Sequence, residues 1–287
     1  MDASIATRLS FGLVVSAGAT DTVTRFDALS AWLKEHGKLE LVARPAPTYK
    51  DLVESVREGS SDIAWLPPVP YAWLAEAVTP VGSIVREGET TYAAALVVRE
   101  DSALNTLADL PGLRDHRERV PRESRGLRAG WVDPWSAAGY VVPRLNLARA
   151  GIEPASAFVN ETFYGSHRDT LLALGRSECD VVGTYARTPR EGGAATDGAW
   201  KEIDDLRVRV LATFGSIPGD VLAVRRNLSP REYEHVVRAL GEAFRDDDAS
   251  VLARSIFGGH ELREGVDHGH DALRRAYESG IANGLFD

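Results

Sequence analysis

An alternation of strand and helix patterns is the feature that most constrains the fold of this chain. Phe26, Leu29 and Leu33 recur at helical spacing between two short apolar runs that favour strands. The order strand, helix, strand, helix, strand is indicated for residues 9–15, 21–37, 39–43, 49–58 and 62–66. This order is typical of a parallel sheet whose faces are covered by helices.

The same plan is repeated in the middle of the chain. Strand, helix, strand, helix and strand patterns follow one another over residues 126–132, 137–150, 157–160, 168–174 and 180–184. In both halves a glycine- and serine-containing turn precedes an aspartate and a β-branched residue, Asp62-Ile63 and Asp180-Val181. We therefore predict two similar lobes, although two such stretches could also belong to one large sheet.

Apolar strands between the two repeats are the candidate crossings from one lobe to the other. These strands cover residues 92–98, 208–214 and 221–224, and helices follow from Pro230 onward. Two crossings would return the C-terminal helices to the first lobe and leave a hinge of extended residues. The predicted domains are residues 1–91 with 218–287 and residues 92–217. Exposed loops are predicted at 114–125 and 192–198.

Composition sets limits on partners. With 44% hydrophobic and 26% charged residues, the chain of 287 has the composition of an ordinary soluble globular protein. The formal net charge of −9 argues against a nucleic-acid or anionic membrane surface. No run reaches the roughly 18 apolar residues of a membrane span. No signal peptide is visible, so two compartments stay open: the cytoplasm, or the periplasm or extracellular space if a leader was removed.

Cys179 is the only cysteine, which excludes an intramolecular disulfide and a thiolate metal cluster. It stands beside Val181 and Val182, a context that favours a small buried hydrophobic residue over a reactive thiol.

Ligands of parallel α/β sheets gather at the carboxyl ends of the strands, where helix N-termini present free N–H groups. Loops of this kind are predicted at residues 16–22, 67–71, 133–140 and 165–167. The strongest is Trp135-Ser136-Ala137-Ala138-Gly139-Tyr140, in which small residues let an anion approach the backbone. Ser136 there could bind a ligand or serve only as an ordinary N-cap. A phosphate loop of the Walker type is absent, because no Gly-Lys-Ser/Thr follows a strand.

Histidines offer two further hypotheses. His167, at a predicted helix start, could donate to an oxyanion or transfer protons, or it could simply cap the helix. His268 and His270 lie between Asp267 and Asp271, an arrangement that suggests a divalent metal. A polar loop ahead of a helix over residues 272–279 explains these residues better, and no metal site is assigned. Aromatic residues near the loops, such as Tyr71 and Trp135, could line a pocket or pack in the core.

In their order along the chain, several motifs resemble the phosphonate-, phosphite- and phosphate-binding branch of the type 2 periplasmic binding proteins, which serve ABC importers. The motifs are Thr48-Tyr49-Lys50-Asp51-Leu52-Val53, Asp62-Ile63-Ala64-Trp65-Leu66, Leu107-Ala108-Asp109-Leu110-Pro111-Gly112, Ser136-Ala137-Ala138-Gly139-Tyr140 and Gly165-Ser166-His167. The resemblance implies a two-lobed fold that closes on a small anionic ligand. The residues expected to contact that ligand are Tyr49, Pro68, Tyr71, Tyr92, Trp135, Ser136, Ala137, Ala138, Ser166, His167 and Tyr185.

The chain departs from the family pattern at three of these positions. The family's helix start is rich in Ser and Thr, whereas this chain has Ala137 and Ala138. Tyr185 lies near where the family often has an acidic residue that accepts a hydrogen bond from its ligand. Each hydrogen bond lost to a buried anion would cost about 1 to 3 kcal/mol.

Three functions are compatible with these observations. The first is a solute-binding protein that has no cofactor and performs no chemistry, with a small molecule and an ABC permease as partners and neither nucleic acid nor membrane insertion. The second is a cytoplasmic enzyme or biosynthetic accessory protein on the same fold, for which His167, Asp180 and Tyr185 would be the catalytic candidates. The third is a ligand-sensing module, although no DNA-binding helix-turn-helix is visible.

Overall fold

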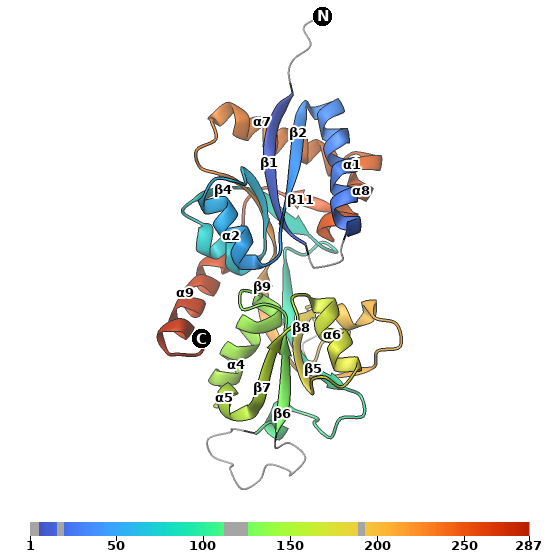
Figure 1. The fold of residues 1–287 in the computed structure, drawn as a ribbon, viewed down its shortest axis with the longest axis vertical. Helices are drawn as coiled ribbons and strands as arrows, with labels where there is room; N and C mark the ends of the chain where they lie inside the picture. Colours follow the sequence, from blue (N-terminus) through green and yellow to red (C-terminus); the bar gives the residue numbers. More distant parts are fainter. Residues whose placement is uncertain (1–5, 16–19, 112–125, 189–192, 287) are drawn as a thin grey trace, which may run out of the picture. The chain divides into compact units, whose positions relative to one another are not determined.

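The computed structural model describes residues 6–15, 20–111, 126–188 and 193–286. The predicted loop at 114–125 and residues 16–19 of the predicted loop at 16–22 lie outside these residues. The chain divides into two compact units, residues 1–90 with 218–270 and residues 91–217 with 271–287 (Figure 1). Each unit contains one mixed sheet with helices on its faces.

The first unit is built on the predicted alternation. Its elements are β1 (Thr7–Val14), α1 (Thr20–Gly37), β2 (Leu39–Ala46), α2 (Tyr49–Arg57) and β3 (Ile63–Leu66). Strand β1 lies between its two parallel neighbours, with Phe11 opposite both Ala43 and Ile63. Phe11 also packs against Phe26 of α1 with ring centroids 4.7 Å apart, so the helical stripe seen in the sequence covers this sheet.

A helix replaces the loop predicted at residues 67–71, after β3. Pro67 precedes α3 (Pro68–Leu74), and Pro68 occupies its first position. Proline suits this position because the first N–H groups of a helix have no partner within the helix. The strand β4 (Val78–Val85), which follows, was not predicted from the sequence pattern.

The later part of the chain completes the first sheet in the order β11-β4-β10-β3-β1-β2. Strand β10 (Val221–Arg225) runs antiparallel to β3 and β4. It is followed by α7 (Pro230–Ala243), α8 (Asp247–Phe257) and β11 (Glu261–Arg263). Both helices begin at side-chain caps, Ser229 and Asp246, as sequence signals for helix starts require.

The second unit is built on a five-stranded sheet, β7-β6-β8-β5-β9, in which three parallel strands and an antiparallel neighbour repeat the arrangement β2-β1-β3-β10 of the first sheet. Its strands are β5 (Thr91–Arg99), β6 (Leu127–Trp131), β7 (Phe158–Phe163), β8 (Val181–Ala186) and β9 (Val208–Pro218). Strand β6 pairs in parallel with β7 and β8, and β5 lies antiparallel beside β8. The helical segments are α4 (Val142–Arg149), α5 (Pro154–Ala157), α6 (His167–Gly175), η1 (Leu107–Asp109) and η4 (Ala199–Glu202).

The C-terminal residues group with the second unit, whereas the sequence pattern placed all of 218–287 in the first lobe. Helix α9 (Gly269–Ala282) starts in the first unit, and residues 271–287 belong to the second. Arg144 explains the difference, because its Nε donates to the carbonyl of Leu285 at 2.8 Å. Phe286 also packs against Tyr140 with ring centroids 5.6 Å apart. These contacts connect residues about 140 positions apart, which no local pattern reveals.

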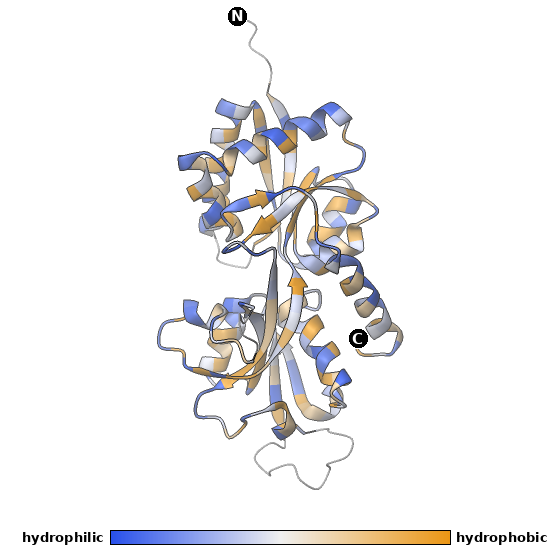
Figure 2. Ribbon diagram, turned by 180° about the vertical axis from the view of Figure 1, so that it is seen from behind, coloured by the Kyte–Doolittle hydropathy of each residue, from blue (hydrophilic) through white to orange (hydrophobic). Residues whose placement is uncertain are grey.

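Hydrophobic residues run along the strands, and hydrophilic residues mark the outer faces of the helices (Figure 2). Among the described residues, no helix is both long and apolar enough to span a bilayer.

Candidate functional site

Several of the predicted site residues lie at one edge of the second sheet, where β6 and β8 end. The turn containing Ser136 follows β6, and Tyr185 stands near the end of β8. Because β5 runs antiparallel to β8 and Ala93 pairs with Ala186, Tyr92 reaches the same edge. Helix α6 begins there after β7, with Ser166 as its cap. This edge carries the carboxyl ends of the parallel strands, where α/β sheets bind ligands.

Ser136 organises the turn after β6. Its Oγ accepts a hydrogen bond from the Gly139 N–H at 3.1 Å, and its carbonyl accepts from the amides of Tyr140 and Val141. The bond to Val141 spans five residues, so the helix predicted from Ala137 opens with a π-turn (Ala137–Val141) before α4. Ser136 is only 2% exposed, and its hydroxyl hydrogen has no acceptor among the described residues. The hydroxyl can therefore still donate to an anion.

Two glycines allow the close packing of this turn. A Cβ at Gly139 would lie 2.3 Å from Val132 Cγ2, and a Cβ at Gly183 of β8 would lie 2.9 Å from the Gly139 carbonyl oxygen. Any larger side chain would push the turn away from β8. The flanking Ala137 and Ala138 are buried and contribute no hydroxyl, so hydrogen bonds from this segment to an anion must come from Ser136 and the backbone.

His167 is the first residue of α6 and contacts β8. Ser166 Oγ accepts from the Asp169 amide at 3.0 Å, which sets the start of the helix. The His167 ring then places Nδ1 3.0 Å from Thr184 Oγ1 and meets the Tyr185 ring edge-on, with centroids 5.1 Å apart. The Tyr185 hydroxyl donates a hydrogen bond to the carboxylate of Glu202 in η4. The family often has an acidic residue near this position, which this chain lacks, and Glu202 places a carboxylate beside Tyr185 instead.

Asp180 lies at the opposite edge of the sheet. It precedes β8, and Arg128 donates to its Oδ2 from the backbone at 2.9 Å and from Nε at 3.0 Å. Burial raises the pKa of the Asp180 carboxyl, but the hydrogen bonds and charge of Arg128 outweigh burial and hold that pKa below its ordinary value. Five strand residues, about 16 Å, separate Asp180 from Tyr185. The structure therefore does not bring together the three catalytic candidates of the enzyme hypothesis.

In the first unit, the predicted residues also lie where parallel strands end. Tyr49 is the first residue of α2, whose start is fixed by a capping box between Thr48 and Asp51. Pro68 begins α3 after β3, and Tyr71 is buried with its ring against that of His270, 4.7 Å between centroids. Pro68 and Tyr71 therefore serve at least in packing.

His270 has both ring nitrogens engaged by the main chain. Nδ1 lies 2.9 Å from the Asp267 carbonyl oxygen and Nε2 lies 3.0 Å from that of Gly219. No cluster of metal-ligating side chains is present in the described part of the chain. His270 instead ties the start of α9 to Gly219, beside the junction at Pro218.

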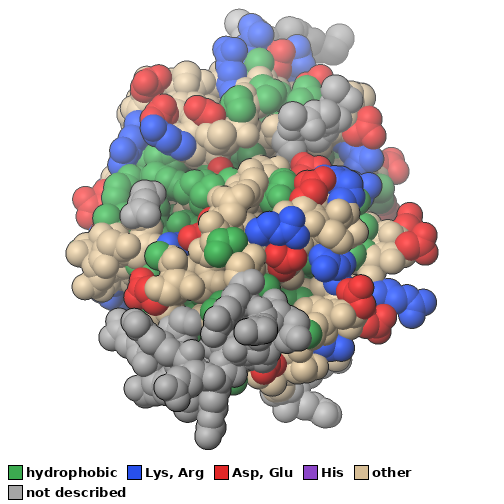
Figure 3. All heavy atoms as spheres, turned by 60° about the horizontal axis from the view of Figure 1, so that its bottom comes forward, with side chains coloured by type: hydrophobic (Ala, Val, Ile, Leu, Met, Phe, Trp, Pro, Cys, Tyr) green, Lys and Arg blue, Asp and Glu red, His purple; other side chains and the backbone are tan. Residues whose placement is uncertain are grey.

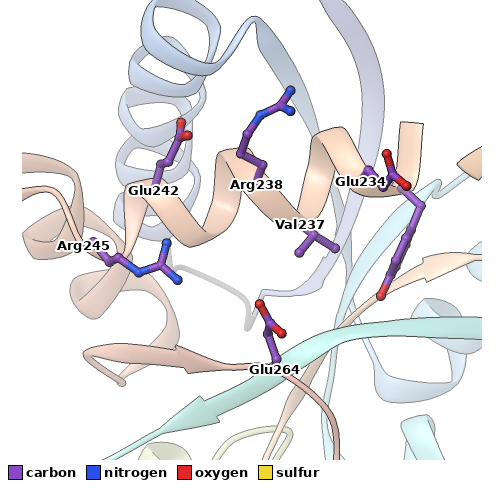
Figure 4. A pocket seen from close by; sticks show the side chains of 7 residues that line it. Glu234, Val237, Arg238, Glu242, Arg245 and Glu264 are labelled. Atoms are coloured by element: carbon purple, nitrogen blue, oxygen red, sulfur yellow. The ribbon is translucent and has the colours of Figure 1, made fainter. Parts of the chain in front are cut away.

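Two surface hollows lie within single units, and neither is lined by a residue predicted to contact the ligand; Asp180 lines the one in the second unit. The hollow in the first unit, of about 320 Å³, is lined by α7, by Arg245 just after it and by the segment after β11 (Figure 4). Its charged residues, Arg238, Arg245, Glu234, Glu242 and Glu264, are of both signs, so it does not favour an anion. Charges of both signs are also interspersed on the face seen in Figure 3.

Sequence reasoning missed Thr184 and Glu202. Thr184 is fully buried in an apolar strand, and its hydroxyl is the only signal of a polar role. Glu202 lies in a segment with no pattern that connects it to β8.

The fold and the site are those of the two-lobed periplasmic binding proteins. Residues 11–268 match the family described as ABC transporter, phosphonate, periplasmic substrate-binding protein, and the chain belongs to that family.

Two curated relatives are each 24% identical to this chain. The phosphonates-binding periplasmic protein of Escherichia coli aligns over 77% of this chain, and a phosphate-import protein of Mycolicibacterium smegmatis over 60%. The alignments span only 62% and 53% of the lengths of these two relatives.

Solved structures share the fold. A binding-protein component of a phosphonate ABC transporter from Pseudomonas aeruginosa superposes with a TM-score of 0.75 and 18% identity, over 97% of this chain and 88% of that one. A Prochlorococcus marinus protein in complex with methylphosphonate gives 0.74 and 14%, over 97% and 98%.

Proposed function

We propose that this chain is the substrate-binding protein of an ABC importer and binds a phosphonate-type oxyanion. The observation that supports this proposal most strongly is the arrangement at one edge of the second sheet. The buried Ser136 hydroxyl, the start of the π-turn and the start of α6 with His167 all lie at that edge. Helix starts present N–H groups and a positive dipole end, which suit a tetrahedral anion.

The family supports the remaining parts of the proposal. The two units act as lobes that close on the ligand, with Tyr49 and the start of α3 contributing from the first. A permease is the partner, and the compartment is the periplasm or its extracellular equivalent. No step of bond making or breaking is involved.

Ligand specificity should depend on the number of hydrogen-bond donors that the site offers to the anion. Ala137 and Ala138 remove two hydroxyl donors relative to the family's helix start, so fewer side chains stabilise a dianion. We expect the highest affinity for anions with an organic substituent, such as methylphosphonate, and weaker binding of inorganic phosphate.

A thermal-shift and calorimetry panel tests this function. Methylphosphonate, phosphite, phosphate, methanesulfonate and an uncharged amide are added to the purified protein. Because only the folded state binds, a ligand at 100 times its Kd stabilises the protein by about 2.7 kcal/mol. Failure of every anion to raise Tm or to release heat would contradict the proposal.

Variants connect binding to the described edge. Ser136→Ala and His167→Gln should each weaken methylphosphonate binding by about tenfold, the effect of one lost hydrogen bond to an anion. Ser156→Ala, an exposed position on α5, is the matched control and should bind like the parent. Equal affinities for all four proteins would place the ligand elsewhere.

A further inference from the structure

Thr184 contacts His167 from the buried side of the second sheet. Its side chain is fully buried, and its Oγ1 lies 3.0 Å from His167 Nδ1. The backbone of Thr184 is held in the ladder opposite Ala95, so the hydroxyl position is fixed by β8 and the ring position by the start of α6.

Hydrogen-bond accounting at this contact distinguishes the two neutral forms of the ring. A hydroxyl can donate to Nδ1, or it can accept from Nδ1–H and direct its own hydrogen elsewhere. Among the described residues, Thr184 Oγ1 has no side-chain or backbone partner except His167. The second arrangement therefore buries a donor without an acceptor, which disfavours it by about tenfold or more.

We propose that Thr184 is a positioning residue that makes Nδ1 of neutral His167 the acceptor and keeps the proton on Nε2. An oxyanion needs a donor, and the other tautomer would present a lone pair to it. With Nε2–H as donor, His167 serves an anion without carrying a positive charge. The role toward ligand rests on the proposed function, whereas the tautomer is a property of the chain alone.

Nitrogen NMR tests the tautomer directly. Ligand-free protein labelled with ¹⁵N-histidine is recorded at pH 7.5, and the His167→Gln variant identifies the His167 signals among the seven histidines. We expect a protonated, pyrrole-like Nε2 and an unprotonated, pyridine-like Nδ1. A proton on Nδ1, an imidazolium, or averaged shifts in the parent protein would overturn the inference.

Three threonine variants separate positioning from folding. Thr184→Val keeps the shape but removes the hydroxyl, and we expect the His167 nitrogen shifts to move toward tautomer averaging. Thr184→Ser should restore the parent spectrum. Thr170→Val is the matched control: Thr170 is equally buried, but its hydroxyl bonds the Ser166 carbonyl at 2.7 Å, so it should leave the His167 tautomer unchanged. Unchanged shifts in Thr184→Val would overturn the inference.

Calorimetry with methylphosphonate then tests the consequence for binding. Thr184→Val should weaken binding by about five- to tenfold, and Thr184→Ser by less than about twofold. Equal Kd values for parent and Thr184→Val would contradict the ligand role. If no anion binds the parent while the NMR result holds, the proposed function fails and the tautomer assignment stands.

Discussion

Asp62 and Asp180 occupy the same position in the two units. Each precedes the third parallel strand of its sheet, and each carboxylate accepts from the backbone amide of a residue 52 positions earlier, Ser10 or Arg128. An arginine also pairs with each, Arg225 with Asp62 and Arg128 with Asp180. The two aspartates thus fix strand registers at the ends remote from the proposed ligand.

These two carboxyls should make the free energy of unfolding depend on pH in the acid range. Burial raises the pKa of the Asp62 carboxyl, but the hydrogen bonds from Ser10 and the pairing with Arg225 outweigh burial, so the pKa lies below its ordinary value. Arg128 has the same effect on the pKa of Asp180. A lowered folded-state pKa contributes stability above the unfolded value, about 3.9, which is lost as pH falls through the folded value. At pH 7, Asp62→Asn and Asp180→Asn should each cost about 1 to 2 kcal/mol, reduced because both groups are partly exposed.

Chemical denaturation at pH 7 and pH 3 checks this expectation. The difference between parent and variant should shrink at pH 3. Asp101→Asn is the matched control, because Asp101 is 83% exposed where it pairs with Arg99. A penalty for the Asp62 and Asp180 variants that is as large at pH 3 as at pH 7 would show that charge is not the cause.

Arg144 should be needed to hold the C-terminal residues on the second unit. It is buried, pairs with Glu161 and donates to the Leu285 carbonyl, while Trp131 Nε1 donates to the same Glu161 carboxylate. Arg144→Met leaves that carboxylate without its cation and should cost about 2 to 3 kcal/mol. Denaturation midpoints measure this cost. Arg263→Met, in an exposed pair with Glu261, should change little, and equal midpoints for both variants would refute the role.

Gly139→Ala should damage the turn after β6. Its Cβ would lie 2.5 Å from Val132 Cβ, and the shift needed to relieve this contact should cost about 2 to 3 kcal/mol. Gly215→Ala is the matched control, because a Cβ there meets no atom within 4 Å. Thermal denaturation should separate the two variants, and methylphosphonate binding should weaken only in the first. Equal Tm values would argue against tight packing at Gly139.

Cys179 should be unreactive in the native protein. Burial raises the pKa of its thiol to about 11, and its side chain is 1% exposed. Only about one thiol in a thousand would then be ionised at pH 8. A chromogenic disulfide reagent should modify the thiol slowly in buffer and at once in guanidinium chloride. Rapid stoichiometric reaction of the folded protein would contradict this.

The sequence by itself determined the fold class and most of the elements, although not α3 or β4. Hydrophobic periodicity over Phe26, Leu29 and Leu33 and caps such as Ser229 act within a few residues, so they predict helices and strands without knowledge of the fold. The repeated turn before Asp62 and Asp180 indicated that two units share one plan. The helix start at Ser136 was also local, because a capping bond spans only three residues.

Tertiary structure decided the rest, because the deciding contacts join distant residues. Arg144 and Leu285 assign the C-terminal segment to the second unit, and Arg128 places Asp180 at the sheet edge opposite Tyr185. Thr184 gained its relation to His167 only when α6 packed on β8. In the sequence, Thr184 looks like any other residue of an apolar strand. Packing places His167 Nδ1 as the one acceptor beside its buried hydroxyl, and this contact is the basis of its proposed positioning role.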